Sequence, residues 1–414
     1  MDIRCGLLGR SLSHSYSPQI HRELGAYPYR LFELEETEIP VFLKRADWTG
    51  INVTIPYKKT VYPYMDEVSP ASRRIRSVNT VIRRPDGSLY GDITDVYGFT
   101  ETVRKSGVCV SGKQTLVLGS GGASAAVCAA LEALNAPYTV ISRRGENNYE
   151  NIDKHAGARI IVNATPVGMY PKNGEAPLDL SRFPQLEGVF DLIYNPARTA
   201  LILQAGALGI PAFNGLYMLV AQAARSAELF TGGKITDETV ERVYNKLAQS
   251  MRNIVLIGMP GCGKSTLGAE IAALTGREFY DSDAEITRLT GRKPSEIIRA
   301  DGEAAFRDTE SGVLRELGKR SACVIATGGG AVLRSENYAY LRQNGVVVWL
   351  KRELDALDDT DRPLLDRAHV RELYAVRAPL YTRFADISTE ITGDADVSAR
   401  RVLATINEYQ EGRA

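Results

Sequence analysis

The segment GMPGCGKST at residues 258–266 constrains the fold more than any other feature of this sequence. It follows the apolar run IVLI and precedes the helical sequence LGAEIAALTG, which is the strand, loop and helix order of a phosphate-binding loop. In such a loop, backbone N–H groups contact phosphate oxygens, a lysine supplies charge and a serine offers its hydroxyl to Mg²⁺. We therefore predict an ATP-binding α/β domain whose nucleotide contacts are Gly261, Cys262, Gly263, Lys264, Ser265 and Thr266.

The position of this loop indicates that other domains precede it, because it begins only at residue 258 of 414. At about 150 residues per domain, a chain of this length predicts two or three domains. Short β-rich runs followed by helical sequence recur along it, namely TLVLGSGG, YTVISRRG, RIIVNATP, CVIATGGG and VVVWLKRE. This alternation predicts parallel sheets with helical crossovers. A helix with Val240, Val243, Tyr244 and Leu247 on one face leads directly into the strand IVLI, so we place a domain boundary near residue 251.

Charge and cysteine content argue against several classes of protein. Fifty basic residues balance fifty acidic ones, so no net field would attract nucleic acid or an anionic membrane. No apolar run approaches the roughly 18 residues that cross a bilayer, and the N-terminal MDIRCGLLGRSLSHS is unlike a signal peptide, which favours a cytoplasmic protein. The five scattered cysteines predict neither a zinc site nor a disulfide framework. We expect most of them in the core, with Cys262 exposed to the nucleotide by its loop.

Acidic and basic residues downstream of the loop indicate an anionic second substrate. In FYDSDAEI, Asp281 and Asp283 are two residues apart, so at a strand end both carboxylates would point to one side. They could hold Mg²⁺ and orient a hydroxyl, although this pattern is more often a solvated turn. Arg307, Arg362 and Arg377 suit an anion, because a guanidinium grips a carboxylate through two hydrogen bonds. Each arginine taken singly is more often a surface charge.

A second glycine-rich loop follows the strand TLVL and opens the helical AAVCAALEAL, and it consists of Gly119, Ser120, Gly121, Gly122 and Ala123. This arrangement places a dinucleotide pyrophosphate at a helix N-terminus. The motif alone is weak, because Ser124 replaces the third glycine and a structural turn fits about as well. After the next strand come Ser142, Arg143 and Arg144, where an NAD enzyme would place an acidic residue. Two arginines suit a 2′-phosphate, which favours NADP, although they also suit the solvated end of a strand.

The first hundred residues contain side chains suited to acid–base chemistry on a small polar substrate. Ser13, Ser15 and Ser17 place hydroxyls at alternate positions, able to bond a carboxylate. Lys58 follows a proline-fixed turn in NVTIPYK, and Asp95 ends the segment GDITD. Alone, such a lysine is more often a surface residue and such an aspartate a helix cap. Their significance comes from their combination with the dinucleotide loop.

The segments GMPGCGKST, DSD, GEAAFR, GGG, RPLL and RAPLY occur in an order that resembles shikimate kinase over about residues 252–390. The resemblance implies that Arg307 and Arg377 clamp the substrate carboxylate and that Asp283 contacts the attacking ring hydroxyl. It also implies that the glycine loop around Gly329 lines the ring.

The same resemblance assigns the metal and a lid. Asp281 would join Ser265 at Mg²⁺, and Arg362 would come from a lid to neutralise the transferring phosphate. The stretches on both sides of RPLL are shorter here than is usual in the family. Because lid closure excludes water from phosphoryl transfer, this compression bears on turnover and ATP affinity more than on substrate identity.

The first part of the chain resembles shikimate dehydrogenase over residues 1 to about 250, through SLSHSYSPQIH, GINVTIPYK, VNT, GDITD, GSGGAS, NATPVGM, DLIYNPART and GLYMLVAQAA. The resemblance implies a catalytic pair, Lys58 and Asp95, and a substrate-binding set that also contains Ser15, Ser17, Thr54, Asn79, Tyr194 and Gln222. It adds to the cofactor loop Asn163, Thr165, Gly215 and Met218. Ile93 and Val96 stand where Asn and Gly are usual, and Ala125 where a basic residue is common, which would weaken NADP binding.

Together these features predict a fused α/β enzyme: a shikimate dehydrogenase-like two-domain unit, with an α/β substrate domain and a Rossmann NADP domain, followed by a P-loop kinase domain. The expected domains are residues 1–100, completed by about 215–250, then 101–214 and 252–414. We expect NADPH-dependent reduction of 3-dehydroshikimate and MgATP-dependent phosphorylation of shikimate, with no nucleic-acid or membrane partner and either a monomeric or a homodimeric state. One alternative is an NAD-dependent quinate/shikimate dehydrogenase joined to a kinase for a related small hydroxy acid. The other is a nucleotide-regulated binding protein whose P-loop domain binds ATP without transferring phosphate.

Overall fold

The computed structural model describes residues 4–13, 15–25, 27–45, 47–357 and 367–411. The chain divides into two compact units. The first contains residues 1–169, 175–194 and 201–249, and the second contains residues 170–174, 195–200 and 250–414. Up to residue 251 the helices are α1 (Ser17–Leu24), α2 (Ile39–Lys44), α3 (Pro70–Ile75), α4 (Thr94–Ser106), α5 (Gly122–Ala133), α6 (Ala200–Ala207), α7 (Leu216–Thr231) and α8 (Asp237–Met251).

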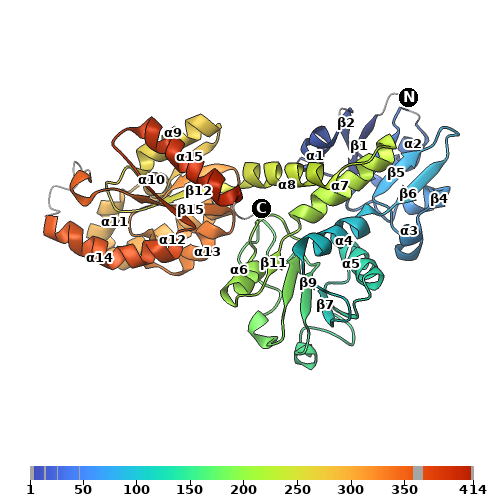
Figure 1. The fold of residues 1–414 in the computed structure, drawn as a ribbon, viewed down its shortest axis with the longest axis horizontal. Helices are drawn as coiled ribbons and strands as arrows, with labels where there is room; N and C mark the ends of the chain where they lie inside the picture. The colour runs from blue at the N-terminus through green and yellow to red at the C-terminus, as the bar shows by residue number, and fades with distance from the viewer. Residues whose placement is uncertain (1–3, 14, 26, 46, 358–366, 412–414) are drawn as a thin grey trace. The chain divides into compact units, whose positions relative to one another are not determined.

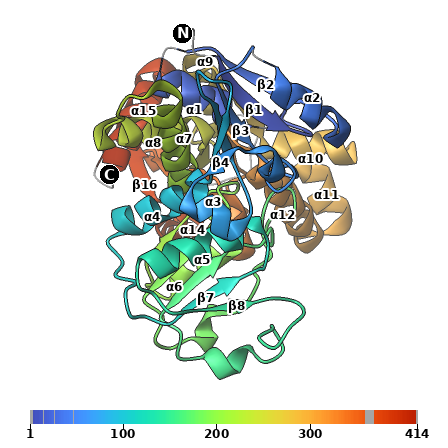
Figure 2. The same cartoon turned by 90° about the vertical axis from the view of Figure 1, so that its right-hand side faces the viewer.

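The first sheet is mixed, with the strand order β2-β1-β3-β5-β6-β4. Its strands are β1 (Cys5–Gly9), β2 (Tyr29–Glu33), β3 (Gly50–Val53), β4 (Glu67–Val68), β5 (Thr80–Arg83) and β6 (Leu89–Asp92). β1 pairs in parallel with β2 and β3, which lie side by side with it in Figure 2, whereas β5 runs antiparallel to β3 and β6. A tight turn with Gly87 at a φ of 88° joins β5 to β6, and only antiparallel strands accept so short a connection.

The second sheet is parallel throughout, with the strand order β11-β10-β9-β7-β8. Its strands are β7 (Thr115–Leu118), β8 (Tyr138–Ile141), β9 (Ile160–Asn163), β10 (Gly188–Asp191) and β11 (Ala212–Phe213). All residues of β7 and β9 are buried, as expected for parallel strands covered by helices on both faces. α4 packs along α7, and α5 packs on β7 (Figure 1). The chain reverses its order across the sheet at β7, and ligands of such sheets bind beyond the carboxyl ends of the strands at that point.

The third sheet is also parallel, with the order β13-β14-β12-β15-β16. Its strands are β12 (Asn253–Ile257), β13 (Glu278–Asp281), β14 (Cys323–Ala326), β15 (Gly345–Lys351) and β16 (Ile387–Glu390). The helices of this unit are α9 (Lys264–Thr275), α10 (Ser282–Thr290), α11 (Pro294–Asp301), α12 (Glu303–Lys319), α13 (Glu336–Arg342), α14 (Arg367–Phe384) and α15 (Ala395–Glu411). Figure 1 shows α9 and α15 on one face of the sheet and α12, α13 and α14 on the other. The predicted parallel sheets with helical crossovers are thus confirmed for the second and third sheets.

The amphipathic helix predicted before residue 251 is α8. Val240, Val243 and Leu247 are buried, and Tyr244 meets Tyr217 edge to face at a centroid distance of 5.5 Å. Only Arg252 separates this helix from β12. No helix in the described ranges combines the length and the apolar character needed to span a membrane.

Candidate active sites

A pocket of about 380 Å³ opens in the first unit beyond the carboxyl ends of β1 and β3 and beside the first turn of α4. Its other wall comes from α7. The lining includes every predicted substrate-binding and catalytic residue of this unit, namely Ser15, Ser17, Thr54, Lys58, Asn79, Asp95, Tyr194 and Gln222. Side chains from the two ends of this unit's sequence therefore meet in one concave site, which is the usual form of a small-molecule site.

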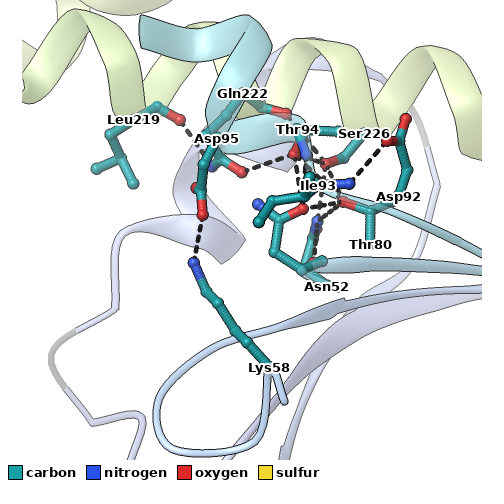
Figure 3. A network of polar contacts seen from close by, with 11 residues as sticks. Asn52, Lys58, Thr80, Asp92, Ile93, Thr94, Asp95, Leu219, Gln222 and Ser226 are labelled. Atoms are coloured by element: carbon teal, nitrogen blue, oxygen red, sulfur yellow. Dashed lines mark hydrogen bonds and ion pairs between the residues drawn. The ribbon is translucent and has the colours of Figure 1, made fainter. Parts of the chain in front are cut away.

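Lys58 and Asp95 form an ion pair at the edge of this pocket (Figure 3). Lys58 Nζ lies 2.5 Å from Asp95 Oδ2, and the two side chains are 27% and 13% exposed. Asp95 occupies the first turn of α4, where the helix dipole favours a carboxylate. The simpler interpretation of the sequence made this aspartate a helix cap. Its carboxylate instead makes no capping hydrogen bond with any described residue and accepts a hydrogen bond from the lysine. An ammonium fixed in this way can donate a proton to an oxygen in the pocket.

A buried hydrogen-bond network lies behind the ion pair and centres on Ser226 of α7 (Figure 3). The Ser226 hydroxyl lies 2.8 Å from Asn52 Nδ2, 2.9 Å from Thr80 Oγ1 and 3.1 Å from Thr94 Oγ1. It also lies 3.0 Å from the carbonyl oxygen of Gln222, to which it can donate. This network was not predicted from the sequence. Asn52 and Thr80 lie 174 and 146 positions from Ser226 along the chain, so no local pattern connects them.

The network orients the amide of Asn79. Its Oδ1 accepts hydrogen bonds from the Thr94 backbone N–H at 2.7 Å and from Thr80 Oγ1 at 3.1 Å. Asn79 Nδ2 has no hydrogen-bond partner among the residues that the structure describes, and Asn79 lines the pocket. The amide therefore offers a donor to an oxygen of the ligand.

We expect Ser226→Ala to destabilise the first unit by about 1–3 kcal/mol, because the buried Asn52 Nδ2 loses its shortest hydrogen bond. Hydrogen exchange of backbone amides in β3 and α7, followed by mass spectrometry, measures this loss. Thr102→Val is the matched control, because the Thr102 hydroxyl is also buried but, among the residues described, bonds only the Gly98 carbonyl oxygen, at 2.8 Å. Equal changes in exchange for the two variants would show that the network adds no stability.

The predicted dinucleotide loop lies at the carboxyl end of β7 and is suited to an anion. Gly121 caps α5, and Ser120, Gly121, Gly122 and Ala123 are exposed, so the N–H groups of this helix terminus are accessible. Gly119 has a φ of 104°, and a Cβ there would come within 3.1 Å of the Ala164 carbonyl oxygen. The backbone conformation therefore favours glycine at this position, and a side chain would also crowd the Ala164 carbonyl oxygen.

The other predicted cofactor residues divide into three groups. Arg143 and Arg144 follow β8, are exposed, and form no ion pair within the described ranges, so their charge suits a phosphate. Asn163 is fully buried, and its Oδ1 accepts from the N–H and the hydroxyl of Thr165, which makes it a support for that turn. The third group lines the Lys58 pocket and consists of Ala123, Gly215 and Met218. Gly119 and residues 142–144 do not line this pocket.

A second pocket, of about 560 Å³, lies in the second unit. The segments after β12, β13, β14 and β15 form its walls together with residues 391–398. Its lining contains the predicted nucleotide contacts from Gly261 to Thr266, together with Asp281, Asp283 and Gly329. Lys264 is 8% exposed, and its Nζ donates to the Gly258 and Met259 carbonyl oxygens at 3.0 and 2.9 Å. The loop therefore holds its lysine against its own backbone.

Asp281 and Asp283 reach this pocket by a different geometry from the predicted one. Asp281 ends β13 and caps α10, with Oδ1 accepting from the Asp283 and Ala284 N–H groups at 2.9 and 3.2 Å. Asp283 is helical, so the prediction that both carboxylates point to one side of a strand is wrong. Both still face the pocket, because α10 begins at its edge.

The Ser265 hydroxyl and the Asp281 carboxylate are suitable ligands for Mg²⁺. The Ser265 hydroxyl donates to Asp281 Oδ2 at 2.5 Å, so a hydroxyl and a carboxylate lie together at the mouth of the loop. No group of three or more His, Cys, Asp or Glu side chains able to hold a metal occurs in the described residues. Mg²⁺ needs no such cage, because it is usually bound by one or two carboxylates with waters and substrate phosphates.

Cys262 corrects a further expectation. Its thiol is buried, 1% exposed, and packs beneath the loop, with Sγ 3.9 Å from Lys264 Nζ. A Cβ on Gly258 would lie 3.0 Å from the same sulfur, so the turn closes over the thiol. The loop offers its backbone to the pocket rather than this side chain. Of the other cysteines, Cys5 and Cys323 are buried as predicted, whereas Cys128 is half-buried and Cys109 is exposed.

Each of the three glycines after β14 lies against a different neighbour. A Cβ at Gly328 would collide with Glu310 Oε1, one at Gly329 with Pro260, and one at Gly330 with the Arg307 guanidinium. This loop brings the two distant arginines together. Arg377 Nη1 donates to the Gly329 carbonyl oxygen at 3.3 Å, and the buried Tyr381 hydroxyl donates to the same oxygen at 2.6 Å.

Glu310 was not predicted and lies beneath these groups. It is completely buried, and its Oε2 accepts from Arg307 Nη1 at 2.7 Å. Burial raises the pKa of Glu310, while the hydrogen bond from Arg307 opposes that rise. The spacing in FRDTE places Glu310 three residues after Arg307, on one helix face, so this pairing could have been found from the sequence. Arg362, the predicted lid residue, lies outside the described residues.

Comparisons with known proteins match both parts of the chain. A family model for the shikimate dehydrogenase substrate-binding domain matches residues 7–81, and one for shikimate kinase matches residues 260–407. The NADP⁺-dependent shikimate dehydrogenase of Clostridium beijerinckii is 35% identical over 221 residues, which cover 48% of this chain and 80% of that protein.

Two solved structures are similar to the first part of the chain. The shikimate 5-dehydrogenase of Thermus thermophilus in complex with NADP(H) and shikimate gives a TM-score of 0.55 at 31% identity, covering 59% of this chain and 99% of that one. The quinate dehydrogenase of Corynebacterium glutamicum in complex with NAD gives 0.54 at 27% identity, covering 60% and 99%. The chain therefore belongs to the shikimate dehydrogenase family and carries a shikimate kinase domain over residues 260–407.

Proposed function

We propose that this protein is a bifunctional enzyme that reduces 3-dehydroshikimate to shikimate with NADPH and then phosphorylates the 3-hydroxyl of shikimate with ATP. The main support is that one chain holds a set of suitable groups for each reaction. One pocket contains the Lys58–Asp95 ion pair, and the other combines the phosphate loop with Asp283. Arg307 and Arg377 converge beside the second pocket, at its glycine loop. The second reaction consumes the product of the first.

In the reduction, the Lys58 ammonium acts as the general acid. Bound NADPH supplies the hydride. As negative charge develops on the carbonyl oxygen of the substrate, Lys58 stabilises this charge and transfers a proton to the oxygen, while Asp95 holds the lysine in place. We assign the substrate carboxylate to Ser15 and Ser17 and the ring to the remaining polar residues of the pocket, Thr54, Asn79, Tyr194 and Gln222.

In the phosphorylation, Asp283 contacts the hydroxyl that attacks the γ-phosphorus. Lys264 and the loop N–H groups stabilise charge on the phosphate oxygens, and Ser265 and Asp281 hold Mg²⁺. Arg307 and Arg377 bind the carboxylate, which fixes the ring against the glycine loop. Most of the acceleration in such a transfer comes from positioning and electrostatic stabilisation rather than from covalent chemistry.

We propose that residues 1–100, completed by about 215–250, bind the substrate of the reduction, that residues 101–214 bind NADP, and that residues 252–414 form the kinase. The three sheets support this division, because they lie within residues 5–92, 115–213 and 253–390. We further propose that the protein acts in the cytoplasm, since all five cysteines are free, as is usual in a reducing compartment.

A coupled assay tests the proposed function. The full chain is given 3-dehydroshikimate, NADPH and MgATP, and the oxidation of NADPH and the release of ADP are followed together. We expect shikimate-dependent ADP release that starts only after reduction begins. Oxidation without ADP release would contradict the kinase assignment. Faster reduction with NADH than with NADPH, or, in the reverse direction with an oxidised nicotinamide cofactor, faster oxidation of quinate than of shikimate, would favour the alternative dehydrogenase instead.

A further inference from the structure

Two cations line the pocket of the second unit among the described residues, Lys264 and Arg352. Lys264 is engaged by two carbonyl oxygens of its own loop. Arg352 is half-buried, and its guanidinium makes no hydrogen bond or ion pair with any described residue. An arginine that lines a pocket and is not paired with a carboxylate has donors available for an anionic ligand.

The sheet explains how Arg352 reaches the phosphate loop. β15 pairs in parallel with β12, with Trp349 opposite Ile257, so the segments after these strands leave the sheet at the same edge. Arg352 is the first residue after β15. Its Nη1 lies 3.6 Å from the position that a Cβ on Gly263 would take. The preceding Lys351 differs, because its Nζ lies over the Trp349 ring, 4.7 Å from the centroid, and Lys351 does not line the pocket.

Polar groups that line the same pocket as Arg352 are engaged within the protein. Asp281 is occupied by the Ser265 hydroxyl and by the start of α10. On the wall formed by residues 391–398, the Ser398 hydroxyl accepts from the Thr392 N–H at 3.0 Å. A guanidinium beside a phosphate loop can bond two phosphate oxygens at once. We infer that Arg352 binds the phosphate chain of the nucleotide, a contact that lies outside the phosphate-loop motif and that deepens the proposed kinase function.

Direct binding of ADP and ATP to the full chain, measured by titration calorimetry without shikimate, tests this inference. We expect Arg352→Ala to weaken both affinities by about tenfold or more, as loss of a charged hydrogen bond does, with Arg352→Lys in between. Adenosine should bind equally to all variants, because it lacks phosphate. Lys351→Ala is the matched control, since it removes the adjacent cation outside the pocket, and its affinities should stay within about twofold of the original chain.

Each other outcome would overturn the inference. Unchanged ADP affinity in Arg352→Ala, or an equal loss in Lys351→Ala, would mean that Arg352 does not touch the phosphates. A parallel loss of adenosine affinity would place the contact at the nucleoside. If the unaltered chain bound neither ADP nor ATP, the pocket would not be a nucleotide site. Binding is measured without turnover. The effect of Arg352 on nucleotide affinity would therefore be seen even if the second unit bound ATP but did not transfer its phosphate.

Discussion

Replacing Lys58 by alanine is expected to lower the rate of NADPH-dependent reduction by at least about a hundredfold, the contribution usual for general acid catalysis. The reason is that the Lys58 ammonium is the only described cation among the lining residues of this pocket and is held by Asp95 at 2.5 Å. NADPH oxidation measures the rate, and NADPH fluorescence measures cofactor affinity, which should be unchanged. Activity that survives within about tenfold would contradict the assignment.

Two further variants make this experiment specific. Lys58→Arg keeps a cation beside Asp95 but cannot give up its proton, so it should be nearly as inactive as the alanine variant. If instead the arginine restored activity, Lys58 would act by charge alone. Lys59→Ala is the surface control, because Lys59 is the adjacent exposed lysine, and it should retain the original rate.

Replacing Lys264 by alanine is expected to reduce shikimate-dependent ADP release by at least about a hundredfold, because the loop then loses the charge that stabilises the transferring phosphate. NADPH oxidation with 3-dehydroshikimate should continue at its original rate, since the Lys58 pocket contains no residue of the phosphate loop. Both rates come from the same coupled assay on the full chain.

Each lysine variant serves as an experimental control for the other. Lys58→Ala should keep ADP release from added shikimate, and Lys264→Ala should keep NADPH oxidation. Lys319→Ala is the surface control for the kinase, because Lys319 forms an ion pair with Glu316 of the same helix, at 2.9 Å, and with no other residue in the described ranges. ADP release that persists in Lys264→Ala would show that this loop does not deliver the phosphate.

Motifs whose parts lie close together in the sequence were predictable. A phosphate loop combines a strand, a turn and a helix start within a few residues, so Gly258–Thr266 could be placed without knowing the sheet. The apolar stripe of α8 and the parallel strands of the second and third sheets followed from local periodicity in the same way. Local pattern also misled: it placed Asp283 on a strand, whereas Asp281 caps a helix that has already begun.

The sequence by itself therefore determined which reactions this protein is suited to, because the motifs for hydride transfer and for phosphate binding each lie within short segments. Only the tertiary structure decided which distant residues share a pocket. The order of strands places Arg352 beside the loop after β12, and the packing of α7 brings Ser226 to Asn52. Backbone hydrogen bonding between strands and burial of helix faces fix these neighbours, and both join positions that have no local pattern in common.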